Sequence, residues 1–567
     1  MAARQLGLLV RSLAVDLSRT ASALRAGTVS SYSTAPTLST VSVPRMDPQA
    51  AAGSGCSLAE LVFNPRLQGI NGNHSASNGS SSSSKNKAEN AAFEEAIVQL
   101  NCLQSNDAAI RNSMSNARVD TKADTIKYLE RSGLPLETVE RLSFIHVAGT
   151  KGKGSTCALT ESLLRHQGYR TGFFSSPHIL STNERIRIDG QLLAKHKFTE
   201  HFWTVYNRLW ELREHDHDMP AYFKFLTILG FHVFVAEGVD VVVLEVGIGG
   251  EHDCTNIVGN VRTVGLTSLG LEHTELLGHT LPEIAWQKAG IIKPGAHVFT
   301  HVSQPECLAV IRQRAQEKAA TLYEVPPTEH YFRSEAYARL WDNFSDMIRL
   351  NGSLAIQLAE DWLAHKGNPP QREHRPNEVR MDAQLLRGLV STHWPGRCQL
   401  VDWQGMRLHL DGAHTLESMA VCTDWFEKSV RGSVNPKILI FNRTGESGVA
   451  PLLELLSRTC AFDLVCFVPN LATSTPNAPS QVMVRFSAEM QLKRARTIAG
   501  EWSQLCARQG QPDKGQVYDT LTEAFAAIRR RFPQTDNGGQ LEVLVTGSIH
   551  LLGAAISALD LIEESQN

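Results

Sequence analysis

The sequence predicts an α/β protein with two domains, each built on a mostly parallel sheet. Apolar runs alternate with amphipathic helical patterns along residues 91–370 and again along 380–567. A glycine-rich turn joins an apolar run at 142–145 to a helical pattern at 157–165. The Val-rich run at 239–246 is typical of a parallel strand that is buried on both faces.

Length and composition exclude several classes of protein. At 567 residues the chain is long enough for about three domains. A net charge of −3 gives no indication of nucleic acid or a membrane surface as a partner. Ten scattered cysteines, without a C-x-x-C pair and without clustering with histidine, argue against a structural zinc site or a secreted disulfide framework, and favour a reducing compartment. No apolar run reaches the length of a transmembrane helix.

The first 45 residues have the composition of a mitochondrial transit peptide. Their single acid is Asp16, whereas five arginines are spread among many Ser, Thr and Ala residues. Met46 follows directly, so we expect two products, one in the mitochondrial matrix and one in the cytoplasm. The alternative is a disordered tail without a targeting role. Residues 46–90 include a serine run and predict a disordered, low-complexity linker, with order beginning near Ala91.

The glycine-rich turn at 146–156 has the context of a phosphate-binding loop, between a strand and a helix. Lys153 would reach the outer phosphates, and Ser155 or Thr156 could give an oxygen to Mg²⁺. The match to G-x-x-x-x-G-K-[ST] is imperfect, because Val147 replaces the first glycine and Gly154 follows the lysine. The alternative is a glycine-rich turn with a chance lysine.

Polar side chains follow other predicted strands of the first domain. A polar segment, 175–178, follows the strand at 169–174, and Glu245 ends the Val-rich run. A buried carboxylate is costly unless it is paired or binds a metal, so we expect Glu245 to bind Mg²⁺ rather than form a salt bridge. His273, past the strand at 261–268, is as compatible with a structural as with a functional role. Taken alone, Lys288 is interpreted as a surface lysine.

Helices are predicted at 198–214, 222–237, 281–289, 305–318 and 354–365.

Strands and helices alternate again after a polar, proline-bearing hinge at 366–376. Strands are predicted at 399–403, 406–410, 437–441, 462–468 and 541–546, and helices at 416–428, 451–457, 521–530 and 550–562. The polar stretch at 470–515 is interpreted as a long insertion. Two motifs flank the first two strands, Trp394-Pro395-Gly396-Arg397 and Leu410-Asp411-Gly412-Ala413-His414-Thr415. An Asp-Gly pair at a strand end fits a tight turn as well as a functional site.

These motifs, in this order, resemble the folylpolyglutamate synthase family of the Mur ligases. The similar segments are 146–156, 175–178, 183–190, 244–256, 269–274, 284–295, 394–397, 410–415 and 543–553. The resemblance runs from about residue 91 to the C-terminus. It implies a Mur-ligase-like P-loop ATPase domain with a mostly parallel sheet, and a smaller Rossmann-like α/β domain. It also implies ATP-dependent addition of L-glutamate to the γ-carboxyl of a folyl-(poly)glutamate through an acyl phosphate, which retains folates for one-carbon metabolism.

The resemblance also implies roles for individual residues. Ser176 and Glu245 would bind a first Mg²⁺, and His273 a second one, together with Lys288 once that lysine is carbamylated. Catalytic roles fall to Lys153, Lys288 and His414. The ATP-binding residues would be Gly149, Thr150, Lys151, Gly152, Lys153, Gly154, Ser155, Thr156, Arg397 and Asp411. A monovalent cation such as K⁺ is a further expected cofactor.

Expected partners are small molecules: a reduced folate polyglutamate, L-glutamate and ATP, without nucleic acid. The resemblance further implies a monomer, with the periphery of the inner mitochondrial membrane as a possible contact. Glu272 stands where the family often has Asp, His279 replaces a common aspartate, and Met347-Ile348 replace a usual His-Gln pair. The last difference puts adenine contacts there in doubt. Rival interpretations are a dihydrofolate synthase and an inactive nucleotide-binding homologue.

Overall fold

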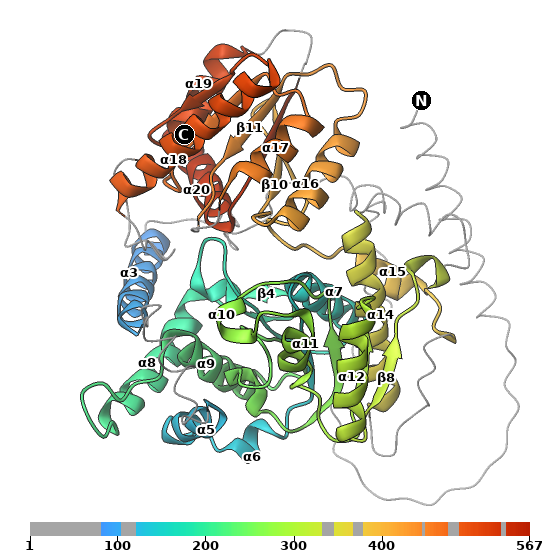
Figure 1. Ribbon diagram of the computed structural model, residues 1–567. Helices are drawn as coiled ribbons and strands as arrows, with labels where there is room; N and C mark the ends of the chain where they lie inside the picture. Colours follow the sequence, from blue (N-terminus) through green and yellow to red (C-terminus); the bar gives the residue numbers. More distant parts are fainter. Residues whose placement is uncertain are drawn as a thin grey trace, which may run out of the picture.

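The computed structural model describes residues 81–103, 121–331, 345–366, 378–444, 448–473, 487–533 and 540–566 (Figure 1). The predicted transit peptide, the Met46 start and the linker up to residue 80 lie outside the described residues, as does most of the predicted hinge. The described residues form two α/β units, one above the other in Figure 1. Among them, no helix is both long and apolar enough to cross a membrane.

The first unit is built on an eight-stranded sheet in the order β4-β3-β2-β5-β1-β6-β7-β8. All neighbours pair in parallel except β2–β3 and β3–β4, which are antiparallel. The strands are β1 (Phe144–Ala148), β2 (Thr171–Phe174), β3 (Ile186–Ile188), β4 (Gln191–Leu192), β5 (Val241–Glu245), β6 (Val261–Leu266), β7 (His297–Thr300) and β8 (Thr321–Glu324). The mostly parallel sheet predicted for this domain is therefore confirmed.

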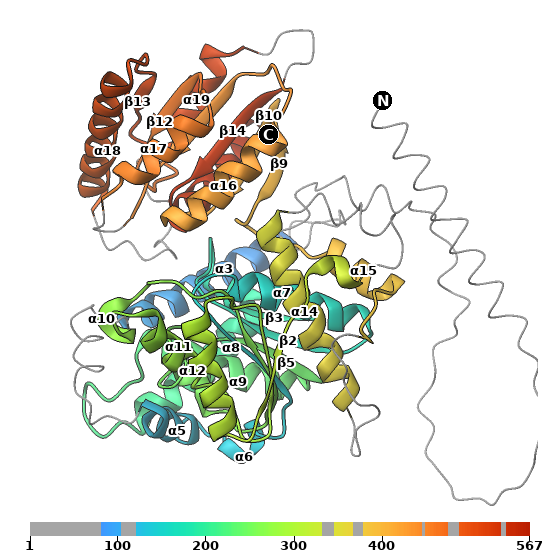
Figure 2. The ribbon, with the colours of Figure 1, turned by 45° about the vertical axis from the view of Figure 1, so that its right-hand side comes forward.

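Helices cover both faces of this sheet. They are α3 (Ser81–Cys102), α5 (Thr121–Arg131), α6 (Leu136–Val139), α7 (Lys153–His166), α8 (Lys195–Glu211), α9 (Tyr222–Glu237), α10 (Thr274–Leu277), α11 (Leu281–Ala289), α12 (Pro305–Glu317), α14 (Asp346–His365) and α15 (Ala383–Val390). Because successive strand residues point to opposite faces, Phe144 of β1 packs with α9 and Ile145 with α7. Figure 2 shows α7, α14 and α15 on one side of the sheet, with α8, α9, α11 and α12 on the other.

The helix α15 belongs to the first unit, although it lies within the predicted second domain at 380–567. Its leucines, Leu385, Leu386 and Leu389, share a core with α7 and α14. A Cβ added at Gly388 would stand 2.9 Å from the Cα of Leu163, so a glycine lets α15 approach α7 closely. We therefore place the boundary between the two units after α15.

The second unit is built on a six-stranded sheet in the order β13-β12-β11-β14-β10-β9, parallel except for β9–β10. The strands are β9 (Gln399–Trp403), β10 (Met406–Asp411), β11 (Lys437–Phe441), β12 (Leu464–Phe467), β13 (Gly515–Val517) and β14 (Leu541–Thr546). The helices are α16 (Leu416–Ser429), α17 (Ala450–Thr459), α18 (Ala488–Gln509), α19 (Leu521–Arg531) and α20 (Ile549–Gln566). One face carries α16, α17 and α18, and the other carries α19 and α20.

Two segments are more ordered than the sequence pattern predicted. The stretch interpreted as an insertion at 470–515 contains α18, whose residues Ile498, Trp502 and Leu505 pack into the core of the second sheet. The first helix, α3, begins at Ser81 rather than near Ala91, because its apolar residues from Phe93 onward anchor a helix that continues into the polar serine run.

Candidate functional site

The loop between β1 and α7 has a backbone that only glycine fits at two positions. A Cβ at Gly149 would collide with the hydroxyl of Thr267, and Gly152 has a φ of 92° with the amide of Asn351 against it. The backbone N–H groups of Thr150 and Lys151 donate to the carbonyl of Ser268, 2.8 and 3.3 Å away. These contacts fix the loop against the ends of β6 and α14.

Two lysines converge on one carbonyl of this loop. Lys153 Nζ donates to the Gly149 oxygen at 3.1 Å, and Lys288 Nζ donates to the same oxygen at 2.8 Å. Lys288 comes from α11 and is buried, so it is not the surface lysine that its position alone suggested. Burial, together with the charge of Lys153, lowers the pKa of Lys288 to about 7. A phosphate group in the loop would meet both nitrogens.

Glu245 lies at the end of β5 beside the same loop. Its Oε2 accepts a hydrogen bond from the backbone N–H of Ser176 at 3.0 Å. Burial raises the pKa of Glu245, and the nearby charges of Lys153 and Arg397 oppose that shift. No described residue forms a salt bridge with Glu245. The alternative that this carboxylate is held by a structural salt bridge therefore lacks a partner.

The space beside Glu245 suits a cation and phosphate oxygens. A Cβ at Gly154 would stand 3.4 Å from Glu245 Oε2 and 2.8 Å from the ring of Trp394, so glycine lets the carboxylate and the ring approach the loop closely. The hydroxyl of Thr156 is buried without a hydrogen-bond partner in the described structure. Mg²⁺ prefers oxygen ligands such as the carboxylate and the unpaired hydroxyl, and phosphate prefers backbone N–H groups such as those of the loop. The residues present therefore fit Mg²⁺ with a nucleotide phosphate.

His273 precedes α10 with a left-handed φ of 52°. Its side chain interacts electrostatically with Lys288 and Lys153, which shows that the turn after β6 faces the two lysines. His279 is exposed, as His273 is, and its backbone N–H donates to Glu283 at the start of α11. The sequence difference at position 279 thus falls at the start of a helix rather than among the phosphate-loop contacts.

The second unit contributes two motifs to this edge. Asp411 is buried at the end of β10, where its two oxygens accept the backbone N–H groups of Ala413 and Cys398 at 2.9 and 2.8 Å. Burial raises the pKa of Asp411, against the charge of Arg397 beside it. Arg397 Nη1 donates to the Gly396 carbonyl at 3.1 Å. Asp411 therefore shapes the turn that carries Arg397.

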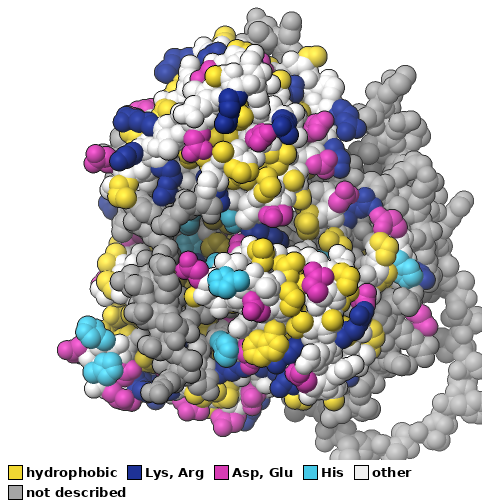
Figure 3. All heavy atoms as spheres, viewed as in Figure 1, with side chains coloured by type: hydrophobic (Ala, Val, Ile, Leu, Met, Phe, Trp, Pro, Cys, Tyr) yellow, Lys and Arg dark blue, Asp and Glu magenta, His cyan; other side chains and the backbone are white. Residues whose placement is uncertain are grey.

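A cluster of three side chains joins the two units. Lys151 Nζ lies 2.8 Å from Glu272 Oε1 and 3.4 Å from His414 Nε2. His414 Nδ1 lies 2.9 Å from the carbonyl of Gly412, which can only accept, so Nδ1 carries a proton and Nε2 is free to accept from Lys151. Burial alone would raise the pKa of Glu272, but the neighbouring His414, 3.9 Å away, and the hydrogen-bonded ammonium group of Lys151 hold it well below its usual value. Figure 3 shows a hollow between the two units that histidine side chains partly line.

Sequence reasoning missed three residues of this edge: Asn351, Thr267 and, as an interaction partner, Glu272. Asn351 is a buried polar residue within an otherwise apolar helical pattern, and that contrast was a usable signal. Thr267 gave no signal, because its contact with Gly149 depends on how β1 and β6 pair. The helix α7 begins at Lys153 rather than at Cys157, so Ser155 lies in its first turn instead of in the loop.

Comparisons with known proteins agree on one kind of relative. No protein-family profile matches the chain. Folylpolyglutamate synthase, mitochondrial, from Bos taurus is 38% identical over 545 residues, which cover 82% of this chain and 92% of that protein. The Homo sapiens protein of the same name is 41% identical over 446 residues, which cover 74% and 75% of the two chains.

Solved structures with the same architecture support the fold. Mycobacterium tuberculosis folylpolyglutamate synthase complexed with ADP superposes with a TM-score of 0.61 at 20% identity, over 83% of this chain and 99% of that one. The apo form of L. casei FPGS gives a TM-score of 0.60 at 22% identity, over the same shares of the two chains. The two-domain α/β fold class predicted from the sequence is confirmed.

Proposed function

The chain belongs to the folylpolyglutamate synthase family, and from this premise we propose that it is an ATP-dependent ligase that adds L-glutamate to folate. The acceptor is the γ-carboxyl of the last glutamate of a reduced folate. The observation that supports this most directly is the convergence of Lys153 and Lys288 on the Gly149 carbonyl beside Glu245. A solved FPGS complex that holds both AMPPCP and folate has the same fold, with a TM-score of 0.58.

The reaction needs two displacements. An oxygen of the folate carboxylate attacks the γ-phosphorus of ATP, and ADP leaves with the electron pair of the broken P–O bond. The amino nitrogen of glutamate then attacks the acyl carbon, loses a proton, and expels phosphate as the C–O bond breaks. Lys153 and the N–H groups of the loop stabilise the charge that develops on the transferred phosphoryl group.

Glu245 and Ser176 are the residues that we assign to Mg²⁺ on the nucleotide, and His273 to a second Mg²⁺. Bound Mg²⁺ neutralises charge on the crowded phosphate and carboxylate oxygens. A pKa of about 7 leaves much of Lys288 as the free amine at neutral pH, the form that reacts with CO₂ to give a carbamate and a proton. Carbamylation would convert this buried lysine into a carboxylate ligand.

His414 and Lys151 extend the proposal to domain closure. Lys151 comes from the phosphate loop and His414 from the turn after β10, and Glu272 contacts both. We assign His414 to the transferred phosphate or the incoming glutamate. Arg397 and Asp411 would hold the nucleotide from the second unit. The contact between the units then couples nucleotide binding to assembly of the site.

Location in the mitochondrion is part of the proposal, since two relatives carry that word in their names. A second, cytoplasmic product from Met46 rests on the sequence of the leader. Three finer parts rest on the family resemblance alone: a monovalent cation such as K⁺, a monomeric chain, and contact with the inner-membrane periphery.

The test is ADP release by the full-length chain with Mg²⁺, ATP and L-glutamate, using either tetrahydrofolate or dihydropteroate as acceptor. Release with tetrahydrofolate that depends on glutamate supports the proposal. Release with dihydropteroate alone would assign the chain to dihydrofolate synthesis. No release with either acceptor would favour the inactive nucleotide-binding alternative.

A further inference from the structure

A histidine–aspartate–histidine cluster lies at the opposite edge of the first sheet from the phosphate loop. His297 is the first residue of β7, whereas the loop follows the last residue of the parallel strand β1. Asp361 and His365 are one turn apart near the end of α14, whose other end carries Asn351 beside the phosphate loop. The cluster is therefore separate from the site described above.

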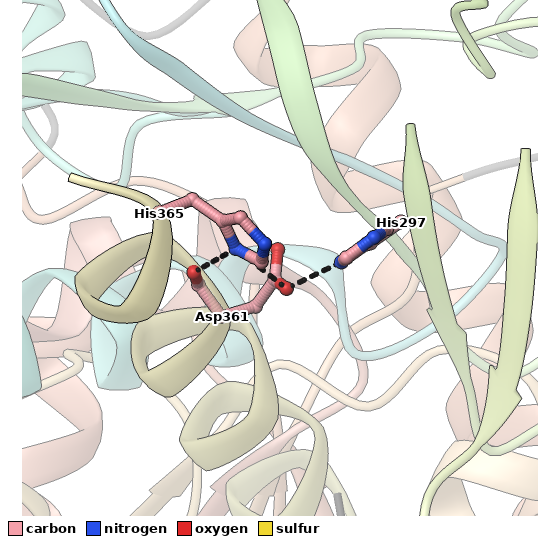
Figure 4. A group of neighbouring side chains, drawn as sticks. All are labelled: His297, Asp361 and His365. Carbon is pink, nitrogen blue, oxygen red and sulfur yellow. Dashed lines mark hydrogen bonds and ion pairs between the residues drawn. The ribbon is translucent and has the colours of Figure 1, made fainter. Parts of the chain in front are cut away.

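The three side chains point toward one another (Figure 4). His297 Nδ1 lies 2.7 Å from Asp361 Oδ1, and His365 Nδ1 lies 3.3 Å from the same oxygen. His365 Nδ1 also lies 2.8 Å from the backbone carbonyl of Asp361. One nitrogen or oxygen from each side chain falls within 4.8 Å of the others. Ligands around a tetrahedral Zn²⁺ with bonds of about 2.0–2.1 Å are about 3.4 Å apart, so small side-chain shifts would bring the three groups to one ion, which would displace the proton that His365 Nδ1 donates to the Asp361 carbonyl.

Asp361 is fully buried, and the basic side chains that lie against it among the described residues are His297 and His365. Its Oδ2 accepts from the hydroxyl of Thr263 at 2.5 Å, and its Oδ1 faces the two imidazoles. A hydroxyl does not offset the charge of a carboxylate out of contact with water, and an imidazole does so only when it is protonated. A divalent cation would offset it, and the Thr263 contact would orient the carboxylate as a metal's supporting hydrogen bond does.

We propose that His297, Asp361 and His365 bind one transition-metal ion, with Zn²⁺ as the first choice. Two imidazoles and one carboxylate are ligands that suit zinc, and three protein ligands leave a fourth position for water. The side chains of His297 and His365 are 16% and 9% exposed, so an ion can enter from solvent. The ion fastens β7 to the end of α14. The sequence argued against a structural zinc site from the pattern of its cysteines, whereas this cluster contains no cysteine.

The experiment is zinc titration by calorimetry of the full-length chain, freed of metal by chelator, with saturating Mg²⁺ and ADP to fill the nucleotide site. His297→Asn removes an imidazole but keeps an N–H donor near Asp361, and His365→Asn does the same on α14. The matched control is the double variant His215→Ala, His217→Ala, which removes two exposed histidines that flank Asp216. Circular dichroism checks that each variant folds.

We expect one zinc ion per chain for the unchanged protein and the control, with affinity at least about 100-fold lower in both asparagine variants. Zinc bound to the unchanged chain should also raise its Tm, because the ion binds the folded state. The absence of stoichiometric zinc binding would overturn the proposal and leave a hydrogen-bonded cluster only. Equal affinity in a folded asparagine variant, or loss of binding in the control, would overturn it too.

Discussion

Replacing Lys153 by Met separates catalysis from stability at the phosphate loop. Lys153 is the first residue of α7, where the positive end of the helix dipole disfavours a cation. Its Nζ shares the Gly149 oxygen with Lys288, 2.8 Å from that oxygen. Removing the Lys153 charge therefore leaves no acceptor unpaired and relieves repulsion between two neighbouring amines.

The expected magnitudes differ for the two properties. Loss of one preorganised donor to a developing anion costs about 10²–10³ in kcat, or about 2.7–4 kcal/mol in the activation free energy. The free energy of unfolding should change by no more than about 1 kcal/mol, a Tm change of about 2–4 °C for a domain of this size. The relief of repulsion from Lys288 and the loss of a favourable charge beside Glu245 oppose each other, which keeps the change small.

Glutamate-dependent ADP release measures the first quantity, and thermal unfolding monitored by circular dichroism measures the second. Lys197→Met is the matched control, because that lysine is exposed on α8 in an ion pair with Glu237. The control should keep its activity within about twofold, as expected for a surface ion pair worth about 0–1 kcal/mol. Activity of Lys153→Met within about threefold of the unchanged chain would refute the reasoning, as would a large fall in Tm.

Three further predictions follow from burial and packing. Glu245→Gln should raise the Mg²⁺ concentration needed for half-maximal ADP release at least about tenfold, and an unchanged requirement would return the residue to a structural role. Gly388→Ala should lower the free energy of unfolding, measured by urea titration, by about 1–2 kcal/mol. The added methyl group would meet the backbone of Leu163, and this overpacking outweighs the better helix propensity of Ala. A stabilised variant would contradict the packing of α15 on α7. Burial lowers the pKa of His232 to about 4, so between pH 6.5 and 4 the unfolded chain binds a proton that the folded chain does not, and the free energy of unfolding falls as the pH drops. His232→Gln should reduce the dependence of the urea midpoint on pH over that range. An unchanged dependence would contradict this account.

Much of both sheets was predictable because buried parallel strands appear in the sequence as apolar runs. The ranges predicted for β9, β11 and β14, and for α9 and α11, coincide with the structure. The short strands β3, β4, β7, β8 and β13 were missed, because two to four residues carry little pattern. The helix α18 was missed for a different reason: its apolar residues at helical spacing are diluted by charged ones.

The site was predictable one motif at a time, but not as a set of contacts. Loop sequence and strand ends gave Lys153 and Glu245. The position of Lys288 at the Gly149 carbonyl depends on how α11 packs against the loop, which no local pattern encodes. The contact of Lys151 with His414 joins residues of different domains, so it too needs the assembled fold.

The central claim is that this chain activates a folate carboxylate as an acyl phosphate before glutamate attacks it. The most direct measurement uses tetrahydrofolate labelled with ¹⁸O in its γ-carboxylate and follows the label by mass spectrometry of the released phosphate. The proposed reaction predicts one labelled oxygen in each phosphate and a folate product longer by one glutamyl residue. Phosphate free of label, or a folate that does not lengthen, would contradict it.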